Sequence, residues 1–151
     1  MATPLGYQIT IDSRDPHAQA RFWADALHYE VEDNDAFIRS LLDQGHITDE
    51  DVVDVDGRLH FAIGAAIHHP DDGDLGPLDQ PPRRRLLFIR VPEDKTGKNR
   101  LHLDLNVGRE RIDAEVARLT ALGATELYRV DEPGAFHTTM ADPEGNEFCV
   151  Q

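Results

Sequence analysis

The chain has 151 residues, the size of one ordinary domain, and 40% of them are hydrophobic while 29% are charged. This balance excludes a disordered tail, and no stretch approaches the roughly 20 consecutive apolar residues that a membrane-spanning helix needs. The formal net charge of -14 argues against nucleic acid and anionic lipid as partners, because such a surface repels phosphate groups.

The cysteine content and the N-terminus bear on the compartment. Cys149 is the only cysteine, so it has no partner for an internal disulfide, which fits a reducing environment. Residues 1–6 lack the basic segment and apolar core of a secretory signal. We therefore expect a cytoplasmic protein.

The first half of the chain predicts a strand, a helix and three further strands. Residues 7–12 alternate between apolar and polar side chains, as a half-buried strand does. Asp15 and Pro16 are suited to cap and begin a helix over 16–27. Further strands are predicted over 28–32, 58–65 and 85–91, with a short helix over 35–44, a helical turn at 48–51 and a loop over 68–82.

The second half repeats this pattern. Residues 101–107 alternate strictly, and apolar residues at helical spacing predict a helix over 109–122 that ends at Gly123. Strands are predicted over 125–131, 135–141 and 146–151, with a turn at 142–145. Two halves of the same pattern indicate a duplication. The alternation also predicts helices on one face of the sheet and an open polar surface on the other.

Three motifs resemble the vicinal oxygen chelate superfamily, which is the glyoxalase, bleomycin resistance and dioxygenase group. They are Asp15-Pro16 followed by Phe22-Trp23, the segment 90–105, and Ala141-Asp142-Pro143-Glu144-Gly145-Asn146-Glu147-Phe148-Cys149-Val150. The last two are similar to an actinobacterial glyoxalase-like branch. The resemblance implies an α+β fold in a single domain over 1–151. Two βαβββ modules, about 5–92 and 99–151, would form paired curved mixed sheets around a central cup that holds a small molecule. It also implies a homodimer.

The resemblance further implies where a divalent metal would bind. The family's ligands are His, Gln or Glu on the first and last strands of each module, and these positions fall on Gln8, Ile89, His102 and Cys149. Gln and His can ligate a metal, whereas Ile89 cannot, and Cys149 stands where the family usually has Glu. Glu147 could substitute, although it lies about 7 Å away along the strand. We therefore expect no resident metal; if one binds, its ligands are Gln8 and His102.

Strand alternation predicts which side chains face the ligand. These candidate ligand-binding residues are Gln8, Thr10, His102, Asp104, Asn106, Glu147 and Cys149. The competing interpretation is that they meet only solvent or pair with one another. Nothing near Cys149 in the sequence activates its thiol, so the sequence favours an inert side chain there. The segment 98–100 either orients an anionic ligand or has a structural role.

Three hypotheses about function follow. The first is a glyoxalase-like protein that binds a small molecule at a degenerate metal site. The second is a metal-dependent lyase, isomerase or dioxygenase that uses Gln8 and His102. The third is a non-enzymatic protein that sequesters a drug or metabolite. The sequence does not identify the ligand, because fold-level analogy does not supply one.

Overall fold

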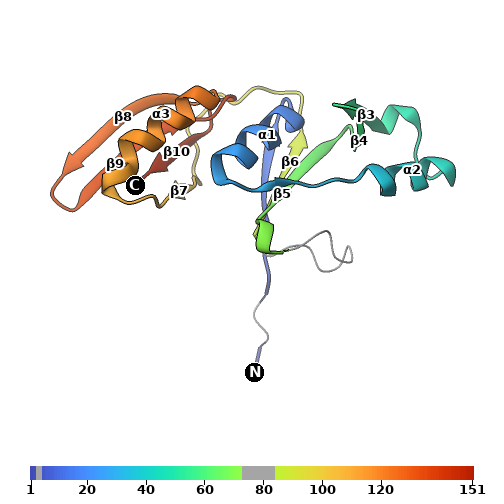
Figure 1. The fold of residues 1–151 in the computed structure, drawn as a ribbon, viewed down its shortest axis with the longest axis horizontal. Helices are drawn as coiled ribbons and strands as arrows, with labels where there is room; N and C mark the ends of the chain where they lie inside the picture. The colour runs from blue at the N-terminus through green and yellow to red at the C-terminus, as the bar shows by residue number, and fades with distance from the viewer. Residues whose placement is uncertain (3–4, 73–83) are drawn as a thin grey trace. The chain divides into compact units, whose positions relative to one another are not determined.

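The computed structural model describes residues 1–2, 5–72 and 84–151, and these form two compact units, Met1–Pro92 and Glu93–Gln151 (Figure 1). Most of the loop predicted over 68–82 lies outside the described residues. The single domain over 1–151 stays a prediction. Within the described ranges, no helix is long and apolar enough to cross a membrane.

The first unit contains a four-stranded mixed sheet with the order β1-β6-β5-β2. Strands β1 and β6 run parallel, and the other neighbours run antiparallel. Its elements are β1 (Ile9–Ser13), α1 (Pro16–Leu27), β2 (Glu30–Val31), α2 (Asp35–Asp43), the 3₁₀ helix η1 (Asp49–Asp51), β3 (Val52–Val55), β4 (Arg58–Phe61), β5 (Gly64–His68), the 3₁₀ helix η2 (Pro70–Asp72) and β6 (Arg85–Arg90).

The second unit repeats this topology, with the order β7-β10-β9-β8. Strands β7 and β10 are parallel, and the remaining neighbours are antiparallel. Its elements are β7 (Asp104–Leu105), the 3₁₀ helix η3 (Arg109–Arg111), α3 (Ile112–Leu122), β8 (Thr125–Glu132), β9 (Ala135–Ala141) and β10 (Glu147–Val150). The predicted α+β class and the repeated βαβββ pattern are therefore confirmed.

Helix α1 begins and ends where the sequence predicts. The carboxylate of Asp15 accepts a hydrogen bond from the Ala18 backbone N–H at 3.0 Å, so it caps the first turn. The helix packs on β5 and β6, and its Trp23 side chain is buried with Phe88 of β6. This face of the first sheet is the apolar core of its unit.

The second unit has the same division of faces. Helix α3 packs on β8, β9 and β10, and Leu119 is fully buried together with Met140 of β9. Along β10, Phe148 and Val150 are buried, whereas Glu147 and Cys149 are only half-buried. The predicted alternation on this strand is confirmed, and Glu147 and Cys149 lie on the face opposite the helix.

The sequence does not predict the hairpin of β3 and β4, which lies between β2 and β5 in the chain. The predicted strand over 58–65 is divided into β4 and β5, and β4 instead pairs with β3 in a separate two-stranded sheet. Asp56 and Gly57 form the turn with φ of 54° and 82°. Two consecutive positive φ values are the geometry of the tight hairpin turn that an Asp-Gly pair favours. That dipeptide was the available sequence signal.

Two other sequence predictions need correction. His68 belongs to β5 and is only 4% exposed, so it is not a solvated loop residue. The strand predicted over 101–107 is assigned only at β7, which is an edge strand beside β10. Backbone bonds extend the contact on both sides, from Cys149 N–H to the Leu103 carbonyl and from Gln151 N–H to the Leu105 carbonyl. Because β7 is an edge strand, it forms backbone hydrogen bonds with β10 alone, and this accounts for its short length.

Candidate functional site

The open face of the second sheet carries a cavity of about 250 Å³. Its walls come from β8, β9 and β10, from the segment before β7, and from β7 itself. The lining residues that matter to the chemistry are Lys98, His102, Asp104, His137, Thr139 and Cys149. Because Cys149 pairs with Asp104 on one side and Thr139 on the other, these three side chains share one face of the sheet.

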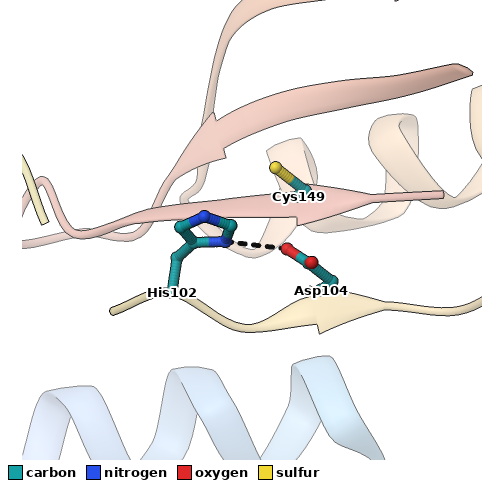
Figure 2. A group of neighbouring side chains, drawn as sticks. All are labelled: His102, Asp104 and Cys149. Atoms are coloured by element: carbon teal, nitrogen blue, oxygen red, sulfur yellow. Dashed lines mark hydrogen bonds and ion pairs between the residues drawn. The ribbon is translucent and has the colours of Figure 1, made fainter. Parts of the chain in front are cut away.

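His102 and Asp104 form a dyad at the mouth of this cavity. Asp104 Oδ1 lies 2.8 Å from His102 Nδ1, and both side chains are about two-fifths exposed, at 42% and 40%. Cys149 projects from β10 beside them (Figure 2). One donor atom from each of the three residues lies within 4.8 Å of the other two. The structure therefore brings together three of the predicted site residues. Cys149 is far from the other two in the sequence.

Cys149 has a further polar neighbour. Its Sγ lies 3.6 Å from the Oγ1 of Thr139, a hydroxyl group on a residue that is only 4% exposed. Thr139 and His137 are not among the residues that the sequence pattern predicts. Strand alternation places both on one face of β9, but the register that aligns Thr139 with Cys149 is a tertiary feature and leaves no local signal.

Glu147 is held by its own unit rather than directed to a ligand. Its carboxylate accepts a hydrogen bond from the Asn99 backbone N–H at 2.9 Å and lies 3.0 Å from Lys95 Nζ. Burial opposes the charged form, but these two bonds prevail and lower the pKa of Glu147 to about 2. Asn99 also donates to the Glu147 carbonyl. The structural interpretation of the segment 98–100 is thereby favoured for Asn99.

The remaining predicted residues lie in local polar pairs. Asn106 accepts a hydrogen bond from Gln151 Nε2 at 3.0 Å in the second unit. Gln8 and Thr10 belong to the first unit, where Gln8 Nε2 lies 3.3 Å from Thr10 Oγ1. Gln8 Oε1 accepts a hydrogen bond of 2.6 Å from Arg85 Nη1. This guanidinium also forms two bonds to Glu32, whose side chain is 1% exposed.

The register of the first sheet corrects one predicted ligand position. Thr10 pairs with Leu87 in the first unit, and Asp104 pairs with Cys149 in the second. If Gln8 corresponds to His102, then Thr10 corresponds to Asp104, so the counterpart of Cys149 is Leu87 and not Ile89. The error arose because no short motif fixes the register of β6. Leucine, like isoleucine, cannot ligate a metal.

The residues at the family's metal positions do not fit a hard divalent ion. Gln8 has its carbonyl oxygen bonded to a guanidinium, whose positive charge would repel a cation. Leu87 offers no donor atom, and Cys149 offers sulfur where an oxygen is usual. Asp104 already accepts from His102. Hard cations prefer six or more oxygen ligands, which these positions do not supply.

A second cavity, of about 300 Å³, lies in the first unit between α1 and the β3–β4 hairpin. His17 and His60 line it, with their ring centroids 5.4 Å apart. Burial lowers the pKa of His17, although its hydrogen bond to the Phe61 carbonyl opposes this effect. The cavity also contains Glu32 and Arg58, each within an ion pair. These two charged groups therefore have partners within the unit.

Comparison with known protein families gives one result. A family described as "Glyoxalase-like domain" matches residues 8–151, which is nearly the whole chain. Among curated proteins, no match is found.

Several solved structures share the fold. A glyoxalase/bleomycin resistance protein/dioxygenase family enzyme from Burkholderia phytofirmans PsJN is 15% identical, with a TM-score of 0.59 over 95% of this chain and 94% of that one. A possible glyoxalase from Bacillus cereus is 13% identical, with a TM-score of 0.57 over 99% of both chains.

A third similar structure contains ligands. It is a variant of the fosfomycin resistance protein FosX from Listeria monocytogenes, complexed with Mn(II) and a dihydroxypropylphosphonic acid. It is 11% identical to this chain, with a TM-score of 0.57 over 100% of this chain and 90% of that one. At such identities the likeness concerns the fold.

Proposed function

Because the chain belongs to the glyoxalase-like domain family of the vicinal oxygen chelate superfamily, we propose that it binds a small molecule in the cavity on the open face of the second sheet. The single observation that carries the proposal is the convergence of His102, Asp104 and Cys149 on this cavity. A concave site with a few converging polar groups is the usual form of a small-molecule site.

The size and chemistry of the cavity suit a small polar ligand. A volume of about 250 Å³ is near the lower end for ligand pockets. Lys98 and His137 can donate hydrogen bonds to an oxygen of the ligand, and Thr139 can donate or accept. Ligand oxygen atoms are therefore the groups that this wall recognises best.

We propose that this binding uses no resident divalent ion. The support is the donor set described above, in which Leu87 and Cys149 stand at ligand positions and the Gln8 carbonyl oxygen already accepts a hydrogen bond from Arg85. A lyase, isomerase or dioxygenase that uses a hard ion would need oxygen donors that these positions lack. A softer ion such as zinc, which His102, Asp104 and Cys149 could hold, is the alternative that elemental analysis tests. Turnover of the bound molecule would separate an enzyme from a sequestering protein.

The test compares the affinity of one ligand, co-purified or found by screening, for three proteins. His102→Ala should weaken binding by about 1 kcal/mol or more, the scale of a lost hydrogen bond, and should leave Tm nearly unchanged. His46→Ala removes an exposed histidine in the first unit and should have no effect. Equal affinities of the wild type and His102→Ala, measured by titration calorimetry, would place the site elsewhere.

A further inference from the structure

We propose that Cys149 is a reactive nucleophile, with His102 as its base and Asp104 as the positioning residue, and that its substrate is a small α,β-unsaturated carbonyl compound. This inference rests on the proposed function, because it assigns a chemistry to the same cavity. This proposal differs from the sequence-based interpretation of Cys149 as an inert side chain.

Asp104 fixes the orientation of the His102 ring. Asp104 accepts a hydrogen bond at Nδ1, so the neutral ring carries its proton there and presents an unprotonated Nε2. The carboxylate also stabilises the positive charge that forms when Nε2 takes up a proton. A carboxylate that orients an imidazole in this way is the arrangement that activates nucleophiles in many enzymes.

The thiol of Cys149 has polar neighbours on the adjacent strands. A nitrogen of His102 and a carboxylate oxygen of Asp104 both lie within 4.8 Å of Cys149 Sγ. The carboxylate opposes a free thiolate, so the thiol proton must pass to the imidazole as the substrate reacts, over a distance that commonly shortens when a substrate binds. Thr139 Oγ1, at 3.6 Å, can donate to a developing thiolate. Cys149 is half-buried and lines the cavity, so a small molecule can reach its sulfur. These neighbours come from different strands, which is why the sequence around Cys149 shows no activating group.

The chemistry of the thiol indicates the class of substrate. A thiolate is a soft nucleophile and reacts readily with the β-carbon of an unsaturated carbonyl compound. Addition there moves the electron pair of the carbon–carbon double bond towards the carbonyl oxygen, where negative charge develops. Lys98 and His137 line the same cavity and can stabilise that oxygen.

The addition balances without a further reactant. His102 Nε2 removes the proton from Cys149 Sγ, and the sulfur forms a bond to the β-carbon. The double bond becomes an enolate, and His102 returns the proton to the α-carbon. One S–H bond and one carbon–carbon π bond are broken, and one S–C and one C–H bond are formed. No oxidant or reductant takes part.

The test measures the rate at which N-ethylmaleimide, a small unsaturated carbonyl compound, modifies the native protein. Because the chain has one cysteine, intact mass spectrometry counts a single addition. At pH 7, His102→Ala should lower the second-order rate about tenfold or more, the scale of general base catalysis. Asp104→Asn should lower it less. His46→Ala should react like the wild type.

Rescue by an added base separates activation from a merely structural effect. Free imidazole should restore part of the rate that His102→Ala loses, because a base that enters the cavity can replace the missing ring. Asp104→Glu, which keeps a carboxylate, should react faster than Asp104→Asn. Equal rates for the wild type and His102→Ala would overturn the proposal, as would one zinc ion per chain that protects Cys149 from modification.

Failure of this inference can be distinguished from failure of the proposed function. Cys149→Ser removes the nucleophile but leaves the cavity and its other polar groups. If Cys149→Ser still binds the co-purified or screened ligand while the wild-type thiol reacts at an ordinary rate, binding stands and the nucleophile is refuted. If no ligand binds and His102 still accelerates modification, the cavity is reactive and the binding proposal is wrong.

Discussion

Arg85 is the single residue that most changes what the first sheet can hold. It donates two hydrogen bonds to the buried carboxylate of Glu32 and a third to Gln8. The sequence predicts that Gln8 lies within a strand over 7–12, whereas β1 begins at Ile9, and the sequence does not reveal the Arg85 partner. Arg85 lies far from both residues in the chain, and only the sheet brings them together.

Replacing Arg85 should lower the free energy of unfolding, because the buried carboxylate of Glu32 would lose its cation. Arg85→Met leaves Glu32 with a side chain that is 1% exposed and no cation beside it, which should lower the free energy of unfolding by about 3 kcal/mol. Arg58→Ala, which breaks the exposed ion pair with Asp33, is the control and should cost less than about 1 kcal/mol. Urea denaturation measures both. Similar losses for the two variants would contradict the account.

Glu147 should make stability depend on acid. Its folded pKa of about 2 lies below the usual value of about 4.3 for the unfolded chain. The stabilisation is therefore present above the unfolded pKa and is lost as pH falls through that range towards 2. Glu147→Gln should be less stable than the wild type at pH 7, and the difference in Tm should shrink as the pH is lowered. A difference that is constant from pH 7 to pH 3 would show that the Lys95 and Asn99 bonds do not stabilise the charged form.

At the scale of elements, the boundaries that the sequence predicts well are those with local signals. Helix α1 has Asp15 and Pro16 at its start, and α3 ends at Gly123, which adopts a positive φ of 117°. The β3–β4 hairpin is missed because no strand is predicted over Val52–Val55 and because the strand pattern over 58–65 continues past the end of β4. Where β4 stops and β5 starts depends on tertiary pairing: β4 joins β3, and β5 joins β6.

Gly64, the first residue of β5, lies very close to the backbone of β6. A Cβ added at Gly64 would lie 2.7 Å from the Phe88 carbonyl oxygen, a backbone atom of β6 that cannot easily move. Gly64→Ala should therefore destabilise the first unit by about 1–3 kcal/mol, as overpacked sites do. Gly6→Ala, where nothing lies within 4 Å of the added atom, is the matched control. Thermal unfolding of both variants tests the prediction; a Gly64→Ala protein as stable as the wild type would refute the close approach.

At the scale of the whole molecule, the repeated topology is the feature that the sequence predicts most completely. The two sheets have equivalent strand orders, and the predicted polar faces of β1 and β10 are present. Hydrophobic periodicity carries that information because each strand alternates independently. The grouping of Cys149 with His102 and Asp104 required the β7–β10 register, which periodicity does not contain.

The resemblance to the superfamily implies a homodimer, and this remains a prediction for the chain. Light scattering should give a mass near twice the 16.9 kDa of one chain. Residues 30–56 are rich in Asp and Glu, and residues 83–100 are rich in Lys and Arg. These two segments offer complementary charge for such an association, so the dimer should weaken as salt increases. A monomer at high protein concentration and low salt would contradict the expectation.

Native mass spectrometry of the purified protein, combined with elemental analysis, tests whether the cavity of the second unit binds a small molecule without a metal. We expect a small organic molecule bound to the wild type and lost in His102→Ala, with no stoichiometric nickel, zinc, iron or manganese. His46→Ala should retain the molecule. About one divalent ion per chain that disappears in His102→Ala, or a bound molecule that the substitution does not affect, would contradict it.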